Sequence, residues 1–195
     1  VFKETGELEL AINNYKQAIK MKPNYSEAYF GLGLALEEKE EFLSAIKNYE
    51  NALLNKPNYP EVFFNLGNVY RKSGDHKLAI KNYKNAIKLN KNYYKAYCNL
   101  GNSKKDLGDV KSARFYYKKA LKINPNDFET MWNMHGVSLS IDEAIKWLSK
   151  CLKAEKNCLK AELMLSALKY LKNDKSDFNR LRKTNLKKHP FMRSF

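Results

Sequence analysis

The chain has 195 residues, and its formal net charge of +15 raises the question of an acidic partner. Its 8 glycines and 5 prolines are too few for long irregular loops, so helices are favoured. No apolar run approaches the roughly 20 residues that a membrane span needs, and no secretory signal is visible, so we expect a cytoplasmic protein without a membrane span.

Two features of the sequence limit the chemistry further. The three cysteines lack CxxC spacing and the three histidines lie far apart, which predicts neither a disulfide framework nor a metal site. The first residue is Val1 rather than Met, from which we expect that the chain is a piece of a longer protein.

One register of 34 residues recurs along most of the chain. Glycine, alanine and tyrosine return at this spacing in four columns. These are Gly33, Gly67 and Gly101; Ala11, Ala45, Ala79 and Ala113; Ala18, Ala52, Ala86 and Ala120; and Tyr15, Tyr49, Tyr83 and Tyr117. The small residues predict a close approach of two helices, and the tyrosines predict side chains that fill the space around that contact.

The columns divide the chain into successive units. Residues 1–25 are interpreted as the end of a unit, mostly its second helix; residues 26–59, 60–93 and 94–127 as full repeats; residues 128–158 as a shortened repeat; and residues 159–195 as a degenerate capping unit with a tail. Within a unit, Gly74 is predicted to end the first helix in the left-handed backbone conformation, and Asp75 is predicted to cap the N-terminus of the second helix. The same turn between helices is predicted at Thr5–Glu7 and Leu107–Asp109. The second helix is predicted to stop at Pro23, Pro57 and Pro125.

A period of 34 residues with this pattern resembles the tetratricopeptide repeat (TPR) family, with repeats most similar to the TPR arm of O-GlcNAc transferase. The motif positions in the second full repeat are Phe63, Leu66, Gly67, Tyr70, Gly74, Asp75, Ala79, Tyr83 and Ala86. The resemblance implies an all-α, right-handed α-solenoid of about five helix-turn-helix units with a degenerate C-terminal unit. It also implies that helix A of each unit lines a concave groove that binds a protein or peptide.

Asparagine recurs on the predicted groove side of helix A. Asn65, Asn99 and Asn133 share the 34-residue register, and "NLGN" places Asn68 and Asn102 one turn further on. A side-chain amide both donates and accepts, so a row of them can bind the backbone of an extended peptide. This is similar to the asparagine ladder of the O-GlcNAc transferase arm, although Gly31 departs from it. A second interpretation stays open, in which these amides join neighbouring helices.

Other groove positions are expected to shape specificity. These are Phe64, Arg71, Lys95, Lys105 and Trp132. Cys98 is also expected to face the groove. A carboxylate clamp for chaperone tails is incomplete here, because Phe30 and Asn99 stand at positions where the family's motif needs basic residues. We find no catalytic constellation or phosphate loop, and expect neither enzymatic activity nor a cofactor.

Charge leads to further hypotheses. Residues 71–122 carry 15 basic and 3 acidic side chains. The recurring basic positions, interpreted as an outer helix face, are Lys77, Lys81, Lys84, Lys88, Lys111, Arg114, Lys118 and Lys122. They suggest an acidic partner, or polyanion or RNA binding as an alternative, although lysine outnumbers arginine and the nearby tyrosines are needed for packing, which argues against nucleic acid.

Two questions concern what adjoins the chain. The repeats could form the targeting arm of a larger glycosyl- or methyltransferase, because TPR arms like this one precede such domains. A truncated first unit would also expose apolar surface, through which two copies could associate.

Overall fold

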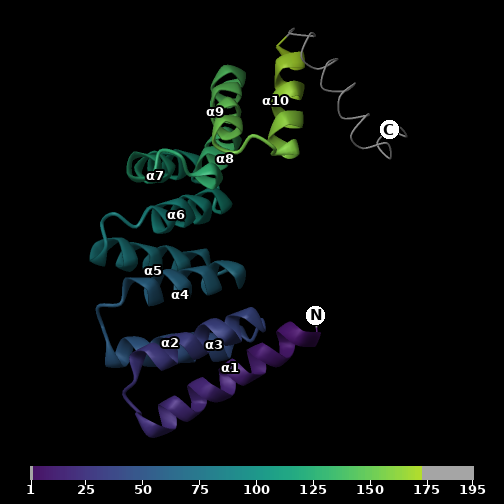
Figure 1. The fold of residues 1–195 in the computed structure, drawn as a ribbon. Helices are drawn as coiled ribbons and strands as arrows, with labels where there is room; N and C mark the ends of the chain where they lie inside the picture. The colour runs from purple at the N-terminus through teal and green to yellow at the C-terminus, as the bar shows by residue number, and fades with distance from the viewer. Residues whose placement is uncertain (1, 173–195) are drawn as a thin grey trace. The chain divides into compact units, whose positions relative to one another are not determined.

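The computed structural model describes residues 2–172, with side chains from Gly6 onward. All regular elements of this part are α-helices, so the predicted all-α class is confirmed. The helices are α1 (Phe2–Met21), α2 (Ser26–Glu38), α3 (Phe42–Asn55), α4 (Pro60–Lys72), α5 (His76–Leu89), α6 (Tyr94–Asp106), α7 (Val110–Ile123), α8 (Phe128–Gly136), α9 (Ile141–Ala154) and α10 (Leu159–Leu171) (Figure 1).

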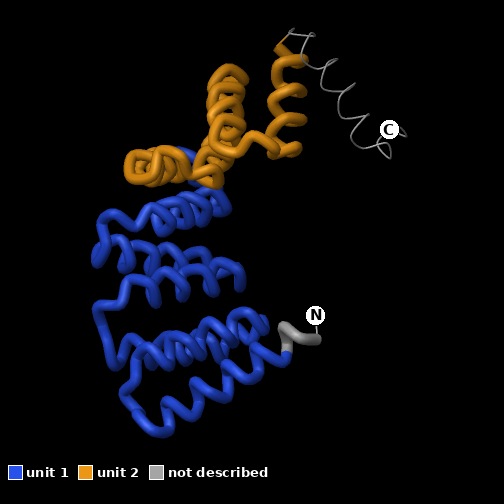
Figure 2. The backbone as a smooth tube through the Cα atoms, in the orientation of Figure 1, with its two compact units in different colours: residues 1–112 blue, residues 113–195 orange. Residues whose placement is uncertain are grey.

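The chain divides into two compact units, and the division falls after residue 112, inside α7 (Figure 2). In the first unit, each helix from α1 to α6 packs on the next one along the chain. In the second unit, α8 packs on α9 and α9 packs on α10. Each unit is therefore built from neighbouring helices that are close in sequence, as expected for a repeat protein.

The contact between the two helices of a hairpin depends on a tyrosine that lies against a glycine. A Cβ atom built on Gly33 would lie 2.5 Å from Tyr49 Cε1, and one built on Gly67 would lie 2.5 Å from Tyr83 Cε1. Both tyrosines are fully buried. The interpretation of the glycine and tyrosine columns as a close helix contact is thus confirmed for these two repeats.

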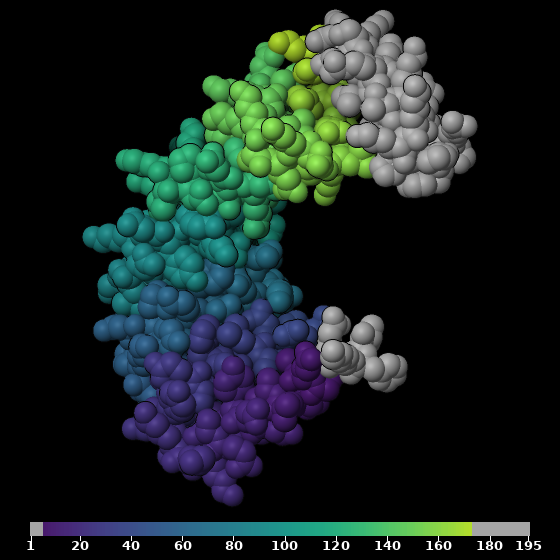
Figure 3. Space-filling view, viewed as in Figure 1, coloured from purple at the N-terminus to yellow at the C-terminus, as the bar shows by residue number. Residues whose placement is uncertain are grey.

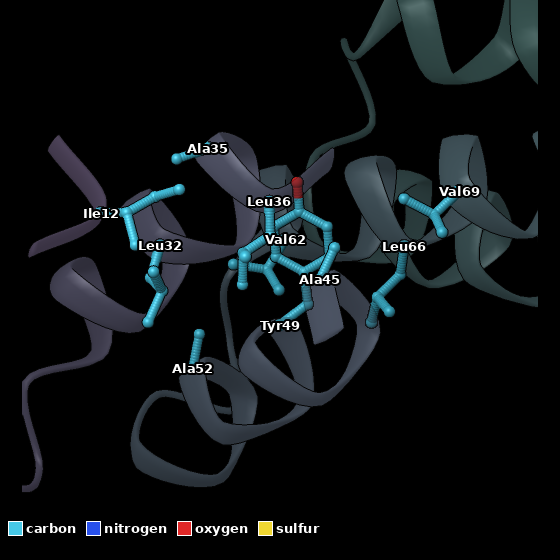
Figure 4. Packing of buried hydrophobic residues seen from close by; sticks show 10 residues of the cluster. All are labelled: Ile12, Leu32, Ala35, Leu36, Ala45, Tyr49, Ala52, Val62, Leu66 and Val69. Atoms are coloured by element: carbon cyan, nitrogen blue, oxygen red, sulfur yellow. The ribbon is translucent and has the colours of Figure 1, made fainter. Parts of the chain in front are cut away.

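Alanines on helix B complete the same contact. Ala45 and Ala52 of α3 have no exposed surface and pack with Tyr49, Leu36 and Val62 in one hydrophobic cluster (Figure 4). Side chains fill the space between the ribbons of the first unit, as the space-filling view shows from α1 to α6 (Figure 3). Burial of this apolar surface is the main stabilising contribution in each hairpin.

The turns between helices A and B have the predicted glycine in two repeats, and a glutamate replaces it in another. Gly74 and Gly108 have φ values of 82° and 78°, in the left-handed region that glycine adopts at low cost. Asp75 Oδ1 then accepts a hydrogen bond from the Leu78 N–H at 2.9 Å. In the first full repeat the equivalent position is Glu40, which has a φ of 60° and so carries strain that glycine would not.

One prediction about helix ends needs correction, and one helix ends without the expected proline. The turn predicted at Thr5–Glu7 does not form, because α1 runs without a break from Phe2 to Met21. Helix α5 ends at Leu89 although Lys91 replaces the proline of the other repeats. There the Asn90 side chain accepts a hydrogen bond from the Asn92 N–H at 3.0 Å, an Asx turn that ends the helix without proline.

An ion pair joins α7 to α9 in the second unit. The Arg114 guanidinium donates to both carboxylate oxygens of Glu143, at 2.7 and 3.0 Å, and to the Val137 carbonyl at 2.7 Å. Its side chain is only 15% exposed. The prediction that Arg114 belongs to a solvated outer face is therefore wrong. Arg114 and the Leu139 N–H hold the pKa of Glu143 down at about 2.

The predicted degenerate unit is described only in part. Its first predicted helix is α10, which packs on α9 and contributes Ala161 to the hydrophobic cluster of the second unit. The second predicted helix, around Phe178, Leu181 and Leu186, lies outside the described residues, as does the C-terminal tail.

Replacement of Glu40 by glycine should stabilise the protein. The relief of a left-handed non-glycine residue is worth about 1–2 kcal/mol, of which the extra freedom of glycine in the unfolded chain removes about 0.4–1 kcal/mol. We expect a higher midpoint of urea unfolding for Glu40→Gly. Glu50→Gly, in the middle of α3, is the control and should lower the midpoint; an equal loss in both variants would contradict the interpretation.

The Arg114–Glu143 pair predicts a specific acid sensitivity. Glu143→Gln should lower the free energy of unfolding at neutral pH by about 1–3 kcal/mol, because it replaces a charged hydrogen-bond acceptor. Since the folded-state pKa lies below the ordinary 4.5, this stabilisation is complete above pH 4.5 and is lost as the pH falls toward 2. Urea unfolding at several pH values should show the difference from wild type shrinking in that window.

The control for this measurement is Glu155→Gln, which removes an exposed carboxylate at the end of α9. Its difference from wild type should be small at every pH. A Glu143→Gln difference that stays constant below pH 4.5 would show that the ion pair does not have the pKa assigned to it.

Candidate functional site

The asparagine positions divide between the two units. Asn65 lies on α4 and Asn99 on α6, both in the first unit, while Asn133 lies on α8 in the second. All three side chains are partly buried. Each of the three has its own set of contacts.

Asparagines of α4 and α6 form a hydrogen-bonded seam between two repeats. Asn68 Oδ1 accepts from the Tyr83 hydroxyl at 2.9 Å and from Asn99 Nδ2 at 2.8 Å. Asn102 Nδ2 donates to Asn99 Oδ1 at 3.3 Å. We call these four residues, Asn68, Tyr83, Asn99 and Asn102, the asparagine seam. The bond between Asn68 and Asn99 supports the interpretation in which amides join neighbouring helices.

The seam depends on the tyrosine–glycine contact described above. Because the Tyr83 ring lies against Gly67, its hydroxyl reaches the side chain of Asn68, the next residue of α4. Burial raises the pKa of Tyr83 well above its ordinary value, so the hydroxyl remains a proton donor at physiological pH. Asn102 is 8% exposed, which makes it the most buried amide of the seam.

Asn65 is in a different state from Asn99, although the two share a register. Its Nδ2 donates to the Glu61 carbonyl of its own helix at 2.9 Å. The residue of α2 that corresponds to Asn68, 34 positions earlier, is Leu34. A leucine cannot accept a hydrogen bond, so Asn65 has no equivalent of the bond between Asn99 and Asn68.

A pocket of about 310 Å³ opens at this point between α2 and α4. Its lining residues are Leu34, Glu37, Glu38, Asn65 and Lys72. The Glu37 carboxylate accepts from the Tyr49 hydroxyl and from Lys72 Nζ, both at 2.8 Å. Leu34 remains 40% exposed, and Glu38 is exposed at the end of α2. The pocket thus combines an apolar wall with carboxylate and amide groups.

Glycine at the first ladder position has a packing reason. A Cβ atom on Gly31 would collide with the Tyr15 ring of α1. An asparagine could not stand there without moving that ring. The departure of Gly31 from the asparagine register is therefore a consequence of how α1 packs on α2.

The other candidate residues of the first unit have different surroundings. The Phe64 ring lies 5.0 Å from the Tyr93 ring and 6.0 Å from the Tyr83 ring, so it takes part in packing within its own repeat. Arg71 Nη1 lies 4.0 Å from Asp106 Oδ2. Lys105 is partly buried on α6 and Lys95 is exposed in its first turn.

In the second unit, Trp132 is surrounded by groups of the same unit. Its ring stacks on Phe128 with a centroid distance of 6.4 Å and contacts His135 at 4.6 Å. Lys160 Nζ lies 5.0 Å from the ring centroid, within the range of a cation–π interaction. Asn133, the next residue, is partly buried.

Cys98 was expected to face the groove, and this is wrong. The residue is only 2% exposed and is one of the buried residues of α6. Cys151 is also buried, and burial raises the pKa of its thiol to about 11. The Cys151 thiol is therefore not activated for nucleophilic chemistry.

Sequence reasoning missed most of the pocket. Leu34, Glu37 and Glu38 were not singled out, because no one of them departs from ordinary helix composition. A signal was available in the register: Leu34 stands where Asn68 and Asn102 stand in the next two repeats.

The described residues also limit the chemistry. Between residues 6 and 172 no three His, Cys, Asp or Glu side chains lie together in a way that could hold a metal ion. None of the helices described is long and apolar enough to cross a membrane. The outward lysines of α5, Lys77, Lys81, Lys84 and Lys88, are all exposed.

Comparison with protein families agrees with the helix pairs. A family model for the TPR repeat matches residues 1–40, 38–74 and 67–108, and a model for the tetratricopeptide repeat matches residues 94–127. The chain belongs to the tetratricopeptide repeat family. The predicted solenoid of TPR units is thus confirmed. No curated protein matches the sequence significantly.

Solved structures share this TPR fold. MamA is 25% identical, with a TM-score of 0.69 over 81% of this chain and 88% of MamA. YrrB, a TPR protein with an unusual peptide-binding site, is 18% identical, with a TM-score of 0.70 over 90% of this chain and 92% of YrrB. Pseudomonas aeruginosa pilF is 17% identical, with a TM-score of 0.83 over 97% of this chain and 87% of pilF.

The contrast between Asn65 and Asn68 in this TPR chain predicts different effects on stability. Asn68→Ala leaves the buried Tyr83 hydroxyl and Asn99 without their acceptor and should cost about 1–3 kcal/mol. Asn65→Ala removes only a bond to its own helix and improves helix propensity, so it should change stability by no more than about 0.5 kcal/mol. Urea unfolding compares the two directly. Equal effects would show that the seam contributes nothing to the packing of the repeats.

Proposed function

We propose that this chain binds an extended segment of a protein partner along the surface of its A helices, with asparagine side chains that contact the backbone of that segment. The chain is a TPR protein-interaction module. Of the structures with the same fold, YrrB has a peptide-binding site, which supports a peptide as the type of partner.

The observation that carries the proposal is the state of Asn65. Its amide makes one bond, to the carbonyl of Glu61, and its Oδ1 takes no hydrogen bond from the described residues. It also lines the pocket between α2 and α4. A primary amide offers two N–H donors and an acceptor oxygen. Asn65 therefore retains the donor and acceptor that a peptide backbone requires.

Asn99 has a more limited role in the proposal. One of its N–H groups donates to Asn68, and its oxygen accepts from Asn102. A second lone pair of its oxygen remains for a ligand. The seam holds this amide in one orientation, which lowers the entropy lost on binding. Asn68 and Asn102 then act mainly by positioning Asn99.

We assign the remaining candidates to specificity. A segment that follows α4 and α6 would pass Phe64, Arg71, Lys95 and Lys105, and one that reaches the second unit would meet Trp132 and Asn133. The arrangement would be similar to the asparagine ladder of the O-GlcNAc transferase arm, with a first rung at Asn65 because Gly31 provides no amide. The three basic groups would favour acidic side chains in that part of the partner.

The test begins with peptides selected from a random library on the intact chain. The affinity of the selected peptides is then measured by fluorescence anisotropy for wild type and for the triple variant Asn65→Ala, Asn99→Ala and Asn133→Ala. We expect the triple variant to weaken binding by about tenfold or more, since each lost hydrogen bond is worth about 0.5–1.5 kcal/mol.

The matched control replaces three asparagines of B helices, Asn13, Asn48 and Asn85. Asn48 bonds to the carbonyl four residues before it, as Asn65 does, so it controls for that change in the helix. Circular dichroism establishes that each variant is folded. If the ladder variant binds the peptides as tightly as the control, the asparagines do not form the binding surface.

A further inference from the structure

We propose that the pocket between α2 and α4 receives a lysine or arginine side chain of the bound peptide. The inference rests on the proposed function and adds the chemistry of one position in the partner. The lining residues are Leu34, Glu37, Glu38, Asn65 and Lys72, all in the first unit, and the pocket has a volume of about 310 Å³.

The pocket exists because the preceding repeat has no equivalent of the asparagine seam. Between α4 and α6, the side chains of Asn68 and Asn99 meet and fill the corresponding position. Between α2 and α4 the same register holds Leu34 and Asn65, which cannot form that bond. The space stays open, and the oxygen of Asn65 stays available at its edge.

The charge of the pocket favours a cation. Two carboxylates, Glu37 and Glu38, face one ammonium group, Lys72. Lys72 is bonded to Glu37 at 2.8 Å, which leaves Glu38 unmatched among the lining groups. The nearby Lys39 does not neutralise Glu38, because its ammonium group pairs with Glu9 at 2.8 Å and with Glu41 at 3.0 Å.

The end of helix α2 adds to the same preference. Glu37 and Glu38 are its last two residues, and its last turn contains no basic side chain. The carbonyl groups at a helix C-terminus carry a partial negative charge that attracts cations. A guanidinium or ammonium group in the pocket would therefore meet the Glu38 carboxylate, the Asn65 oxygen and the negative end of a helix.

The shape of the pocket fits a long side chain with a charged end. Leu34 gives it an apolar wall that is 40% exposed, and lysine and arginine bury their methylene stems on such surfaces. Its volume of about 310 Å³ lies at the lower limit for small-molecule sites, which is consistent with one side chain. An acidic side chain would be repelled by Glu38.

The experiment titrates the intact chain with Nα-acetyl-arginine amide and follows backbone amide signals by NMR. Nα-acetyl-norleucine amide has a stem without the charge and serves as the probe control. We expect saturable shifts at Leu34, Glu38 and Asn65 with the arginine compound only. Shifts of the same size with the norleucine compound, or none at these residues with either, would overturn the proposal.

Two variants change the pocket in opposite directions. Glu38→Gln should weaken the arginine compound about fivefold, since it removes one partner of an exposed ion pair. Lys72→Met should strengthen it, because Glu37 is then released to bind the ligand. The control is Glu50→Gln, which removes an exposed carboxylate on α3. If Glu38→Gln behaves like Glu50→Gln, or Lys72→Met weakens binding, the assignment is wrong.

The two proposals can fail separately. If the pocket binds the arginine compound but the ladder variant holds selected peptides at full affinity, only the asparagine mechanism is lost. If selected peptides depend on the asparagines and the arginine compound leaves the pocket unchanged, only the cation site is lost. The titration needs no selected peptide, so each result stands on its own.

Discussion

The packing of a tyrosine ring against a glycine on the partner helix is the constraint on which the first unit depends. Tyr49 on Gly33 and Tyr83 on Gly67 bring helices A and B closer than any side chain on the glycine would allow. This close approach also carries each hydroxyl past helix A, to Glu37 in one repeat and Asn68 in the next. The polar chemistry of the candidate surface is therefore arranged by the same contact that builds the core.

The structure changes how the asparagines are understood. Two interpretations were open, a ligand ladder and a set of bonds between helices, and the side chains do not all follow one of them. Asn68 is engaged between helices, and Asn65 is engaged only with its own helix. Asn99 bonds both to Asn68 of α4 and to Asn102 of its own helix. Residues in one sequence register can thus differ in availability, because the residue opposite each of them differs.

Much of the fold was predictable from the repeated columns, since each column reflects one local packing rule. Glycine beside tyrosine, alanine on helix B and glycine followed by aspartate required no knowledge of distant contacts. One error arose where a residue's partner lies in another hairpin. Arg114 is basic and sits on a helix face with lysines, and only the position of Glu143 shows that it is paired.

The candidate site was predictable to a smaller extent. The asparagine register identified Asn65, but the pocket beside it depends on Leu34, which cannot form the bond that Asn68 forms in the next repeat. One repeat taken alone does not show that an asparagine is missing there. The strain at Glu40 was hidden for a similar reason, because the glycine of the other repeats is simply missing there. Comparison of each repeat with the next, position by position, would have found both.

The junctions between successive hairpins of the first unit are held by different forces. Between α2 and α4 the polar contact is an ion pair at 2.8 Å, Lys72 with Glu37. Between α4 and α6 the neutral amides Asn68 and Asn99 bond at 2.8 Å, and the charged groups of Arg71 and Asp106 are 4.0 Å apart. Dissolved ions screen attraction between exposed charges and have little effect on neutral hydrogen bonds. Ionic strength therefore weakens the first of these junctions more than the second, so the flexibility of the first unit varies along its length with the salt around it.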